Sequence, residues 1–133
     1  MKYLFDTSVV IDLLRQKIDT WNFLENHKKD EIISSSICKA EVMVGIYHSK
    51  SKNIESRKKL ADDLFESFSE VVDFDDEMAE IAGRIKAKLL FSGKIIDDFD
   101  VLIAATAIAK NATVVTSNVK HFARVENLRI LTV

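Results

Sequence analysis

The sequence opens with the stretch Lys2-Tyr3-Leu4-Phe5-Asp6-Thr7-Ser8-Val9-Val10, and this stretch decides the fold class. The apolar run 2–5 predicts a short strand, and Asp6, Thr7 and Ser8 are residue types that favour the N-cap of a helix. A helix is expected to follow at once, over 9–15. A strand, a turn and a helix in such rapid succession are typical of a parallel sheet with crossover helices.

The rest of the chain repeats this alternation. We expect further strands over 31–35, 71–74, 113–116 and 129–132, and helices over 18–27, 37–47, 54–68, 77–91 and 98–109. The pattern predicts an α/β fold, a mostly parallel central sheet flanked by helices on both faces. Trp21 and Leu24 are expected in the core. Ligands of such sheets bind at the carboxyl ends of strands, here directly after Phe5, Ser35 and Thr116.

Length and composition exclude several classes of protein. With 133 residues, 47% hydrophobic and 30% charged, the chain fits one globular domain, 1–133. The longest apolar run, Val101–Ala109, is about half of what a bilayer requires, and the first residues do not read as a signal peptide. A single cysteine excludes an intramolecular disulfide, and three scattered histidines do not make a zinc site. We expect a cytoplasmic protein with no membrane partner.

Charge is distributed unevenly along the chain, although the net charge is only −2. Residues 60–100 are rich in acids, and the cations gather elsewhere. The cations that could contact phosphates are Lys50, Lys52, Arg57, Lys58, Lys59, Lys110, Lys120 and Arg124. This distribution suits a protein that meets a polyanion and also holds cations, but solvated helix faces of opposite sign are the alternative.

Two acids lie at positions that capping alone does not explain. Glu41 has apolar or small neighbours three and four residues away on its helix, so we expect its carboxylate to project from a buried face. Such a carboxylate must be neutral, bound to a metal, or paired with a distant lysine or arginine. Asp100 opens the most apolar helix of the chain, beside Asp97 and Asp98. The helix dipole favours anions there, but three like charges repel one another, and a divalent cation would relieve the repulsion.

Polar residues also end the strand over 113–116. Thr116-Ser117-Asn118 is either an ordinary turn or a neutral wall of the same site. Asp6 likewise has a simple alternative role, as the N-cap of the first helix. Because the candidate ligands are hard oxygens, Mg²⁺ or Mn²⁺ is favoured over zinc.

Four motifs in order along the chain resemble a known family. They are Asp6-Thr7-Ser8, then Cys38-Lys39-Ala40-Glu41-Val42, then Asp98-Phe99-Asp100-Val101-Leu102-Ile103-Ala104-Ala105-Thr106-Ala107, and last Thr116-Ser117-Asn118 with Phe122. In this order and spacing the chain resembles a PIN-domain protein of the VapC toxin type. The similarity covers essentially the whole chain.

The resemblance implies an Mg²⁺- or Mn²⁺-dependent endoribonuclease, the toxin of a toxin–antitoxin pair. It implies a homodimer that pairs with an antitoxin, and tRNA or ribosomal RNA as the substrate. Asp6 and Asp100 would hold the metal, and Glu41 would orient or deprotonate the attacking water. Asn118 is expected among the catalytic residues, at the place where the family often has a fourth acid. Because its amide carries no charge, the resemblance leaves open whether a second metal position is occupied. The residues expected around these are Thr7, Ser8, Asp98, Thr116 and Ser117, of which Asp98 would partly compensate for Asn118.

Three other interpretations remain open at this point. Asn118 in place of an acid would suit a PIN-like regulatory or binding module that does not cleave. A phosphatase of the haloacid-dehalogenase type would need an acid where Ser8 stands. A response-regulator domain would need a pair of acids where Asp6 stands alone.

Overall fold

A computed structural model describes residues 1–50 and 53–133 of the chain, and in these residues five parallel strands form one sheet. The strands are β1 (Lys2–Phe5), β2 (Glu31–Ser35), β3 (Glu70–Val72), β4 (Thr113–Thr116) and β5 (Ile130–Thr132). The helices of the described part are α1 (Thr7–Leu14), α2 (Ile18–Asn26), α3 (Ser36–His48), α4 (Ile54–Ser67), α5 (Asp76–Phe91), α6 (Asp98–Ala109) and α7 (Val119–Phe122).

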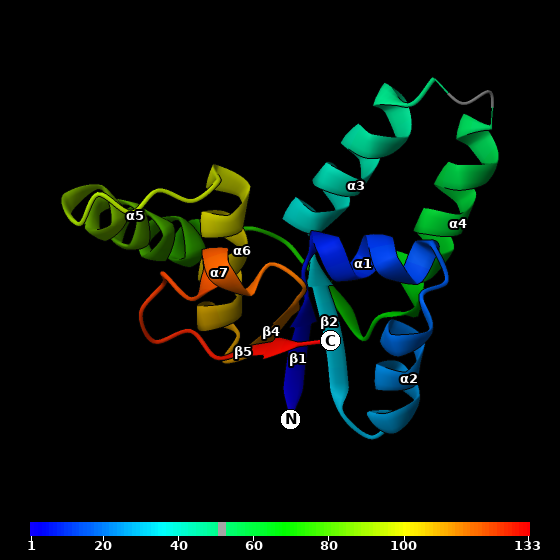
Figure 1. Cartoon of the computed structure of the whole chain (residues 1–133), viewed down its shortest axis with the longest axis horizontal. Helices are drawn as coiled ribbons and strands as arrows, with labels where there is room; N and C mark the ends of the chain where they lie inside the picture. Colours follow the sequence, from blue (N-terminus) through cyan, green and yellow to red (C-terminus); the bar gives the residue numbers. More distant parts are fainter. Residues whose placement is uncertain (51–52) are drawn as a thin grey trace.

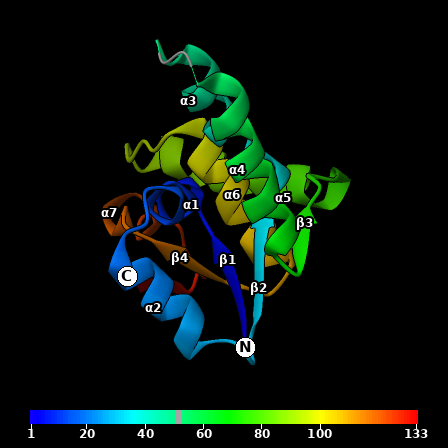
Figure 2. The same ribbon diagram turned by 90° about the vertical axis from the view of Figure 1, so that its right-hand side faces the viewer.

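The strand order is β3-β2-β1-β4-β5, so the direction in which successive strands are added to the sheet reverses beside β1. From β1 the chain moves outward to β2 and β3, then returns to β4 on the other side. Helices α1 to α4 therefore lie on one side of the sheet and α5 to α7 on the other (Figures 1 and 2). The expected α/β fold with helices on both faces is confirmed. The carboxyl ends of β1 and β4 meet at the reversal, the place where such sheets bind ligands.

Most predicted elements lie within one residue of the expected bounds. The helix expected over 9–15 is α1 at Thr7–Leu14, the strand expected over 71–74 is β3 at Glu70–Val72, and the sequence does not predict α7. Trp21 is 40% exposed rather than in the core, and its indole N–H donates to the Leu13 carbonyl across 3.3 Å. Leu24 packs against the core as expected, and so does Phe23, whose ring meets those of Tyr3 and Phe5.

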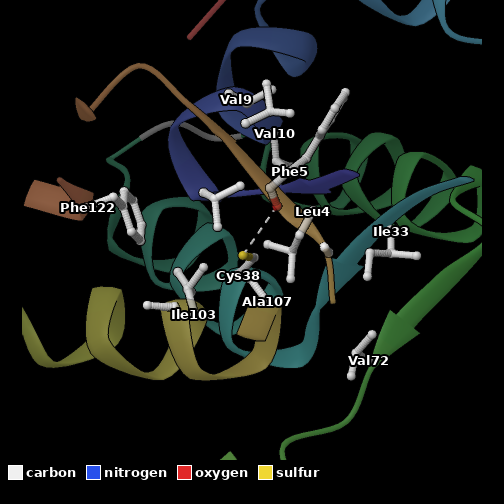
Figure 3. Close-up of a cluster of buried hydrophobic side chains, with 14 of the residues drawn as sticks. Leu4, Phe5, Val9, Val10, Ile33, Cys38, Val72, Ile103, Ala107 and Phe122 are labelled. Atoms are coloured by element: carbon white, nitrogen blue, oxygen red, sulfur yellow. Dashed lines mark hydrogen bonds between the residues drawn. The ribbon is translucent and has the colours of Figure 1, made fainter. Parts of the chain in front are cut away.

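The core lies between the sheet and both helix layers (Figure 3). Leu4, Phe5 and Val114 of the central strands are fully buried, as is Cys38 of α3. Burial raises the pKa of the Cys38 thiol to about 11, and the thiol donates to the Phe5 carbonyl at 3.5 Å. These contacts fix the ends of β1 and the start of α3 relative to each other, directly below the candidate site.

None of the helices in the described ranges is both long and apolar enough to cross a membrane.

Candidate functional site

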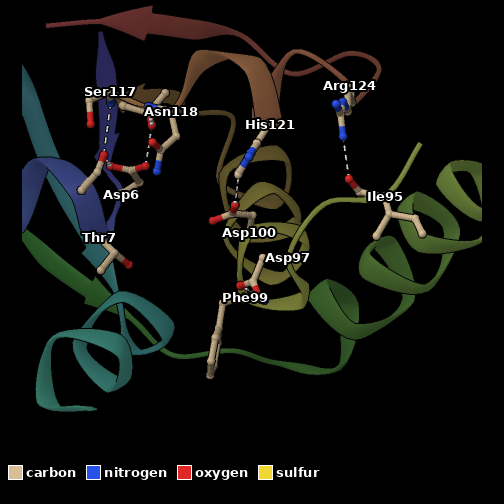
Figure 4. Close-up of polar contacts among 12 residues, drawn as sticks. Asp6, Thr7, Ile95, Asp97, Phe99, Asp100, Ser117, Asn118, His121 and Arg124 are labelled. Atoms are coloured by element: carbon tan, nitrogen blue, oxygen red, sulfur yellow. Dashed lines mark hydrogen bonds and ion pairs between the residues drawn. The ribbon is translucent and has the colours of Figure 1, made fainter. Parts of the chain in front are cut away.

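Asp6 lies at the carboxyl end of β1 and links three segments (Figure 4). Its Oδ1 accepts hydrogen bonds from the Ser8 hydroxyl at 2.7 Å and from the Val9 N–H at 3.0 Å, so it does cap α1. Its Oδ2 accepts from the Thr116 hydroxyl at 2.5 Å. The side chain is 2% exposed. Asp6 is therefore both the N-cap of α1 and the junction between β1 and β4.

The segment after β4 is held against α1 by its polar groups. The Asn118 N–H donates to the Thr116 hydroxyl at 2.8 Å, and the Ser117 N–H donates to the Ser8 hydroxyl at 3.1 Å. Figure 4 shows Ser117 and Asn118 next to Asp6. The three residues thus do more than form a turn: they build one wall around the Asp6 carboxylate, with the Asn118 side chain exposed.

Glu41 reaches the same place from α3. Its Oε1 accepts a hydrogen bond from the Thr7 hydroxyl at 2.6 Å, and its side chain is half-buried. The expectation that it projects from a buried face holds only toward the helix start, where Cys38 is buried: Val44 is 62% exposed and Gly45 is exposed. The buried residues of α3 are Cys38, Val42 and Ile46, with Ile37 and Met43 partly buried against the core, because the helix rises past the carboxyl edge of the sheet (Figure 1).

The start of α6 supplies two further acids. Asp100 is mostly buried, with a side-chain exposure of 14%, and its Oδ2 lies 3.2 Å from His121 Nδ1 of α7. Asp97 is the N-cap of α6 and accepts from the Phe99 N–H at 3.1 Å. Figure 4 shows Asp97 and Asp100 together on the face toward His121.

Asp98 departs from the expected position. Its side chain is 82% exposed and pairs with Lys86 of α5 at 2.7 Å. The expectation that Asp98 supports the other acids is therefore corrected, since its carboxylate turns to α5 and Asp97 takes that place. As the N-cap, Asp97 folds its side chain back over the start of α6. The Asp98 side chain points outward, where Lys86 of α5 pairs with it.

The electrostatics show that the acids from β1, α3 and α6 converge. Burial raises the pKa of Asp6 above its ordinary value, and the Asp100 charge raises it further. Burial also raises the pKa of Glu41, with added repulsion from Asp100, Asp97 and Asp6. The pKa of Asp100 is raised by burial and by Asp97, against the lowering effect of His121. We call Asp6, Glu41, Asp97 and Asp100 the acid cluster.

Compensation of these charges is small. In the described residues, the ion pairs of Asp6, Glu41 and Asp100 are limited to the contact of Asp100 with His121. The same residues contain no group of three or more His, Cys, Asp or Glu side chains arranged to hold a metal ion directly. Mg²⁺ usually keeps several waters and is held by one or two carboxylates, so this donor set fits a hydrated divalent cation.

The cations singled out in the sequence are mostly engaged away from the acid cluster. Lys58 and Lys59 pair with acids of their own helix, Asp62 and Asp63. Lys110 pairs with Glu70 at the amino edge of the sheet and lies near Met1 and Lys2. Arg124 lines a different part of the surface, so the two cations do not form one phosphate-binding patch. Lys52 lies outside the described residues.

Two residues of the site were not predicted from the sequence. Asp97 was noted only as a neighbour of Asp98, and the N-cap pattern before an apolar helix was the signal that could have selected it. His121 gave no signal, because its contact with Asp100 spans 21 residues and depends on the position of α7.

Comparison with known proteins agrees with this geometry. The family model of the PIN domain matches residues 3–128. Ribonuclease VapC2 of Rickettsia felis is 38% identical over 130 residues, covering 96% of this chain and 95% of that protein. The tRNA(fMet)-specific endonuclease VapC of Shigella flexneri is 28% identical, covering 97% and 96%. The crystal structure of VapBC2 from Rickettsia felis bound to a promoter DNA fragment contains a chain that matches with a TM-score of 0.91 and 32% identity, covering 100% of this chain and 99% of that one.

A five-stranded parallel sheet with acids from β1, α3 and α6 at its carboxyl edge is a PIN domain, and the chain belongs to this family. Within the family, the relatives of this chain are VapC ribonucleases. The sequence similarity extends over nearly the whole chain, so the chain is a member of this group. The haloacid-dehalogenase and response-regulator interpretations are thereby excluded.

Proposed function

We propose that the chain is a divalent-metal-dependent endoribonuclease that uses Mg²⁺ or Mn²⁺, and the toxin of a toxin–antitoxin pair. The observation that carries the proposal is the acid cluster itself. Asp100 raises the pKa of Asp6, and Asp6, Asp97 and Asp100 raise the pKa of Glu41. His121 is the one ion-pair partner of Asp6, Glu41 and Asp100 among the described residues. Like charges gathered in this way favour a divalent cation and are typical of functional sites.

Each residue of the site has a part in this proposal. Asp6 and Asp100 would hold the cation, directly or through water. When bound, the cation would supply positive charge at the scissile phosphate and make water a better nucleophile. Glu41 orients the attacking water or accepts its proton, which its raised pKa favours. Asn118 offers a neutral amide at the exposed rim of the site.

The hydroxyls hold the carboxylates in place. Thr116 and Ser8 fix the two oxygens of Asp6, and Thr7 fixes Glu41. Ser117 contributes its backbone N–H, which holds the Ser8 hydroxyl. Outer hydrogen bonds of this kind orient the groups that contact a metal, and their loss typically costs about 10- to 100-fold in affinity or activity.

The partners follow from the relatives. An antitoxin partner is supported by a solved structure described as a toxin-antitoxin complex from Klebsiella pneumoniae, which matches with 27% identity and a TM-score of 0.69, covering 98% of this chain and 96% of that one. We propose tRNA or ribosomal RNA as the substrate, because one relative is named for tRNA(fMet), and such a substrate places the protein in the cytoplasm. A homodimer is proposed as well, since Val44, Tyr47 and Leu60 leave apolar surface exposed on α3 and α4.

The test is cleavage of end-labelled tRNA and ribosomal RNA by the purified protein, with Mg²⁺, with Mn²⁺ and with EDTA. We expect discrete cuts with either metal and none with EDTA. Cleavage that persists in EDTA would contradict the metal dependence. Binding of metal without cleavage of either RNA pool would favour the non-cleaving regulatory module instead.

A further inference from the structure

A groove of about 490 Å³ lies on the side of the molecule formed by α5, α6 and the segment after α7. Its floor is aliphatic and consists of Ile81, Ile85, Leu89 and Ile108. Its rim carries four cations, Arg84, Lys88, Lys94 and Arg124, against one acid, Glu126. We call this the α5–α7 groove. It is separate from the acid cluster, and no role for it follows from the chemistry described above.

Within residues 1–50 and 53–133, two of the rim cations have no carboxylate partner within 4.0 Å. Lys88 pairs with Glu126 at 2.5 Å, and Arg84 pairs with Glu80 at 2.9 Å. Arg124 instead donates to a neutral group, the Ile95 carbonyl, at 2.6 Å. Lys94 forms no ion pair within 4.0 Å in the described part of the chain, although its charge helps to hold the pKa of Glu126 below the usual value. The rim therefore presents net positive charge above an apolar floor.

The groove and the acid cluster share the same two segments. Arg124 binds the carbonyl of Ile95, two residues before Asp97. His121, on the same turn as Arg124, contacts Asp100. Figure 4 shows these two links side by side, bridging from the C-terminal segment to the start of α6. These two contacts tie the rim of the groove to the segment that carries Asp97 and Asp100.

We propose that the α5–α7 groove binds an unpaired nucleotide of the RNA substrate, next to the bond that is cut. This inference rests on the proposed ribonuclease function. The base would lie on the aliphatic floor, and Lys94 and Arg124 would bind the adjoining phosphate. The volume lies within the range of sites for small organic ligands. A base inside a duplex stays stacked and cannot enter, whereas bases in loops can be splayed out.

The test compares Lys94→Glu with Lys29→Glu. Lys29 lines a second basic pocket, at the amino edge of the sheet, together with Lys2, Lys110 and Arg129. Lys29→Glu therefore makes the same change of charge, but at the edge of the sheet opposite the acid cluster. For RNA with an unpaired loop, we expect Lys94→Glu to lower kcat/KM on the order of fivefold or more, with kcat at saturating RNA unchanged. The dependence of log(kcat/KM) on log salt should flatten by about 0.7 for the lost phosphate contact. Lys29→Glu should match the unaltered protein.

Several results would overturn the proposal. Equal effects of the two substitutions would show a general field effect rather than a groove. Equal weakening toward loop and fully duplex RNA would contradict insertion of a nucleotide. An effect of Lys94→Glu on antitoxin binding alone would assign the groove to a protein partner. If the unaltered protein cleaves no RNA, the proposed function fails, and fluorescence anisotropy of loop RNA with both variants still decides whether the groove binds it.

Discussion

The amino and carboxyl edges of the sheet both carry charged groups, but in different states. At the amino edge the charges are paired across short distances: the Met1 amino group with Asp30 at 3.3 Å, Lys2 with Glu31 at 3.2 Å, and Lys110 with Glu70 at 3.5 Å. At the carboxyl edge, carboxylates from three elements lie close to one another, and in the described residues the ion-pair contacts of Asp6, Glu41 and Asp100 are limited to the one between Asp100 and His121.

The paired charges of the amino edge are typical of a solvated surface, whereas the largely unpaired acids of the carboxyl edge are typical of a functional site. Exposed ion pairs such as those at the amino edge contribute about 0–1 kcal/mol each. Partly buried like charges do the opposite, because burial and mutual repulsion both disfavour ionisation. The acid cluster therefore lowers the stability of the protein at neutral pH. The same carboxylates can bind a cation at the β1–β4 junction.

The largest expected effect comes from removing an acid at the carboxyl edge. Asp100→Asn should lower the rate of RNA cleavage on the order of 100-fold or more, because the proposed cation loses one of its two carboxylates. The matched change at the amino edge, Glu70→Gln, should leave the rate unchanged. Single-turnover cleavage at saturating Mg²⁺ measures both. Similar losses in the two variants would mean that the edges do not differ in function.

A smaller effect is expected from the hydroxyl that holds Asp6. Thr116→Val keeps the shape of the buried side chain but removes the hydrogen bond to Asp6 Oδ2 and the acceptor for the Asn118 N–H. We expect a loss of about 10- to 100-fold in cleavage rate.

Thr113 provides the control for this change, because it is also buried and lies at the amino end of the same strand. Thr113→Val should leave the cleavage rate unchanged. Circular dichroism of both variants checks that each is folded. If Thr116→Val were folded and fully active, the hydroxyl would have no part in positioning Asp6.

The smallest effect concerns stability and its dependence on pH. Because the pKa of Glu41 is raised in the folded state, the folded protein binds more protons than the unfolded one above the ordinary value of 4.5. Stability therefore falls as the pH rises through this range. Without metal, Glu41→Gln should be more stable at pH 7.5 by about 0.5 kcal/mol, a figure that allows for solvent screening of a half-buried group.

Well below pH 4.5 the difference should disappear, since Glu41 is then protonated in both states. Denaturant titrations at about pH 3 and at pH 7.5 measure it. A variant that is less stable at pH 7.5 would show that ionised Glu41 stabilises the fold and that the acid cluster carries no cost.

The sequence predicts the central part of the fold well because that part depends on local patterns. The strands at 2–5, 31–35 and 113–116 and the helix at 98–109 have the expected bounds, since each is an apolar run next to a capping residue. Helix α7 has four residues, too few for a periodic pattern, and it is held by the burial of Phe122. Such an element is set by tertiary packing.

The candidate site was predictable in outline for a related reason. Parallel strands bring their carboxyl ends to one edge, so an acid directly after β1 and another at the start of a buried helix were expected to converge. The exposure of Val44 beside Glu41 could not be predicted, because it depends on how far α3 rises beyond the sheet. The roles of Asp97 and Asp98 depend on side-chain directions and on Lys86 of another helix.

The metal site is tested most directly by titrating the metal-free protein with Mn²⁺ and measuring binding by calorimetry or electron paramagnetic resonance. We expect the protein to bind Mn²⁺, Asp100→Asn and Asp6→Asn each to weaken this binding strongly, and Glu70→Gln to leave it unchanged. Bound metal should also raise the melting temperature, by an amount equivalent to about 2.7 kcal/mol at 100 times the Kd. Binding that is absent in the unaltered protein, or equal in all four proteins, would contradict the claim that the carboxyl-edge acids form a metal site.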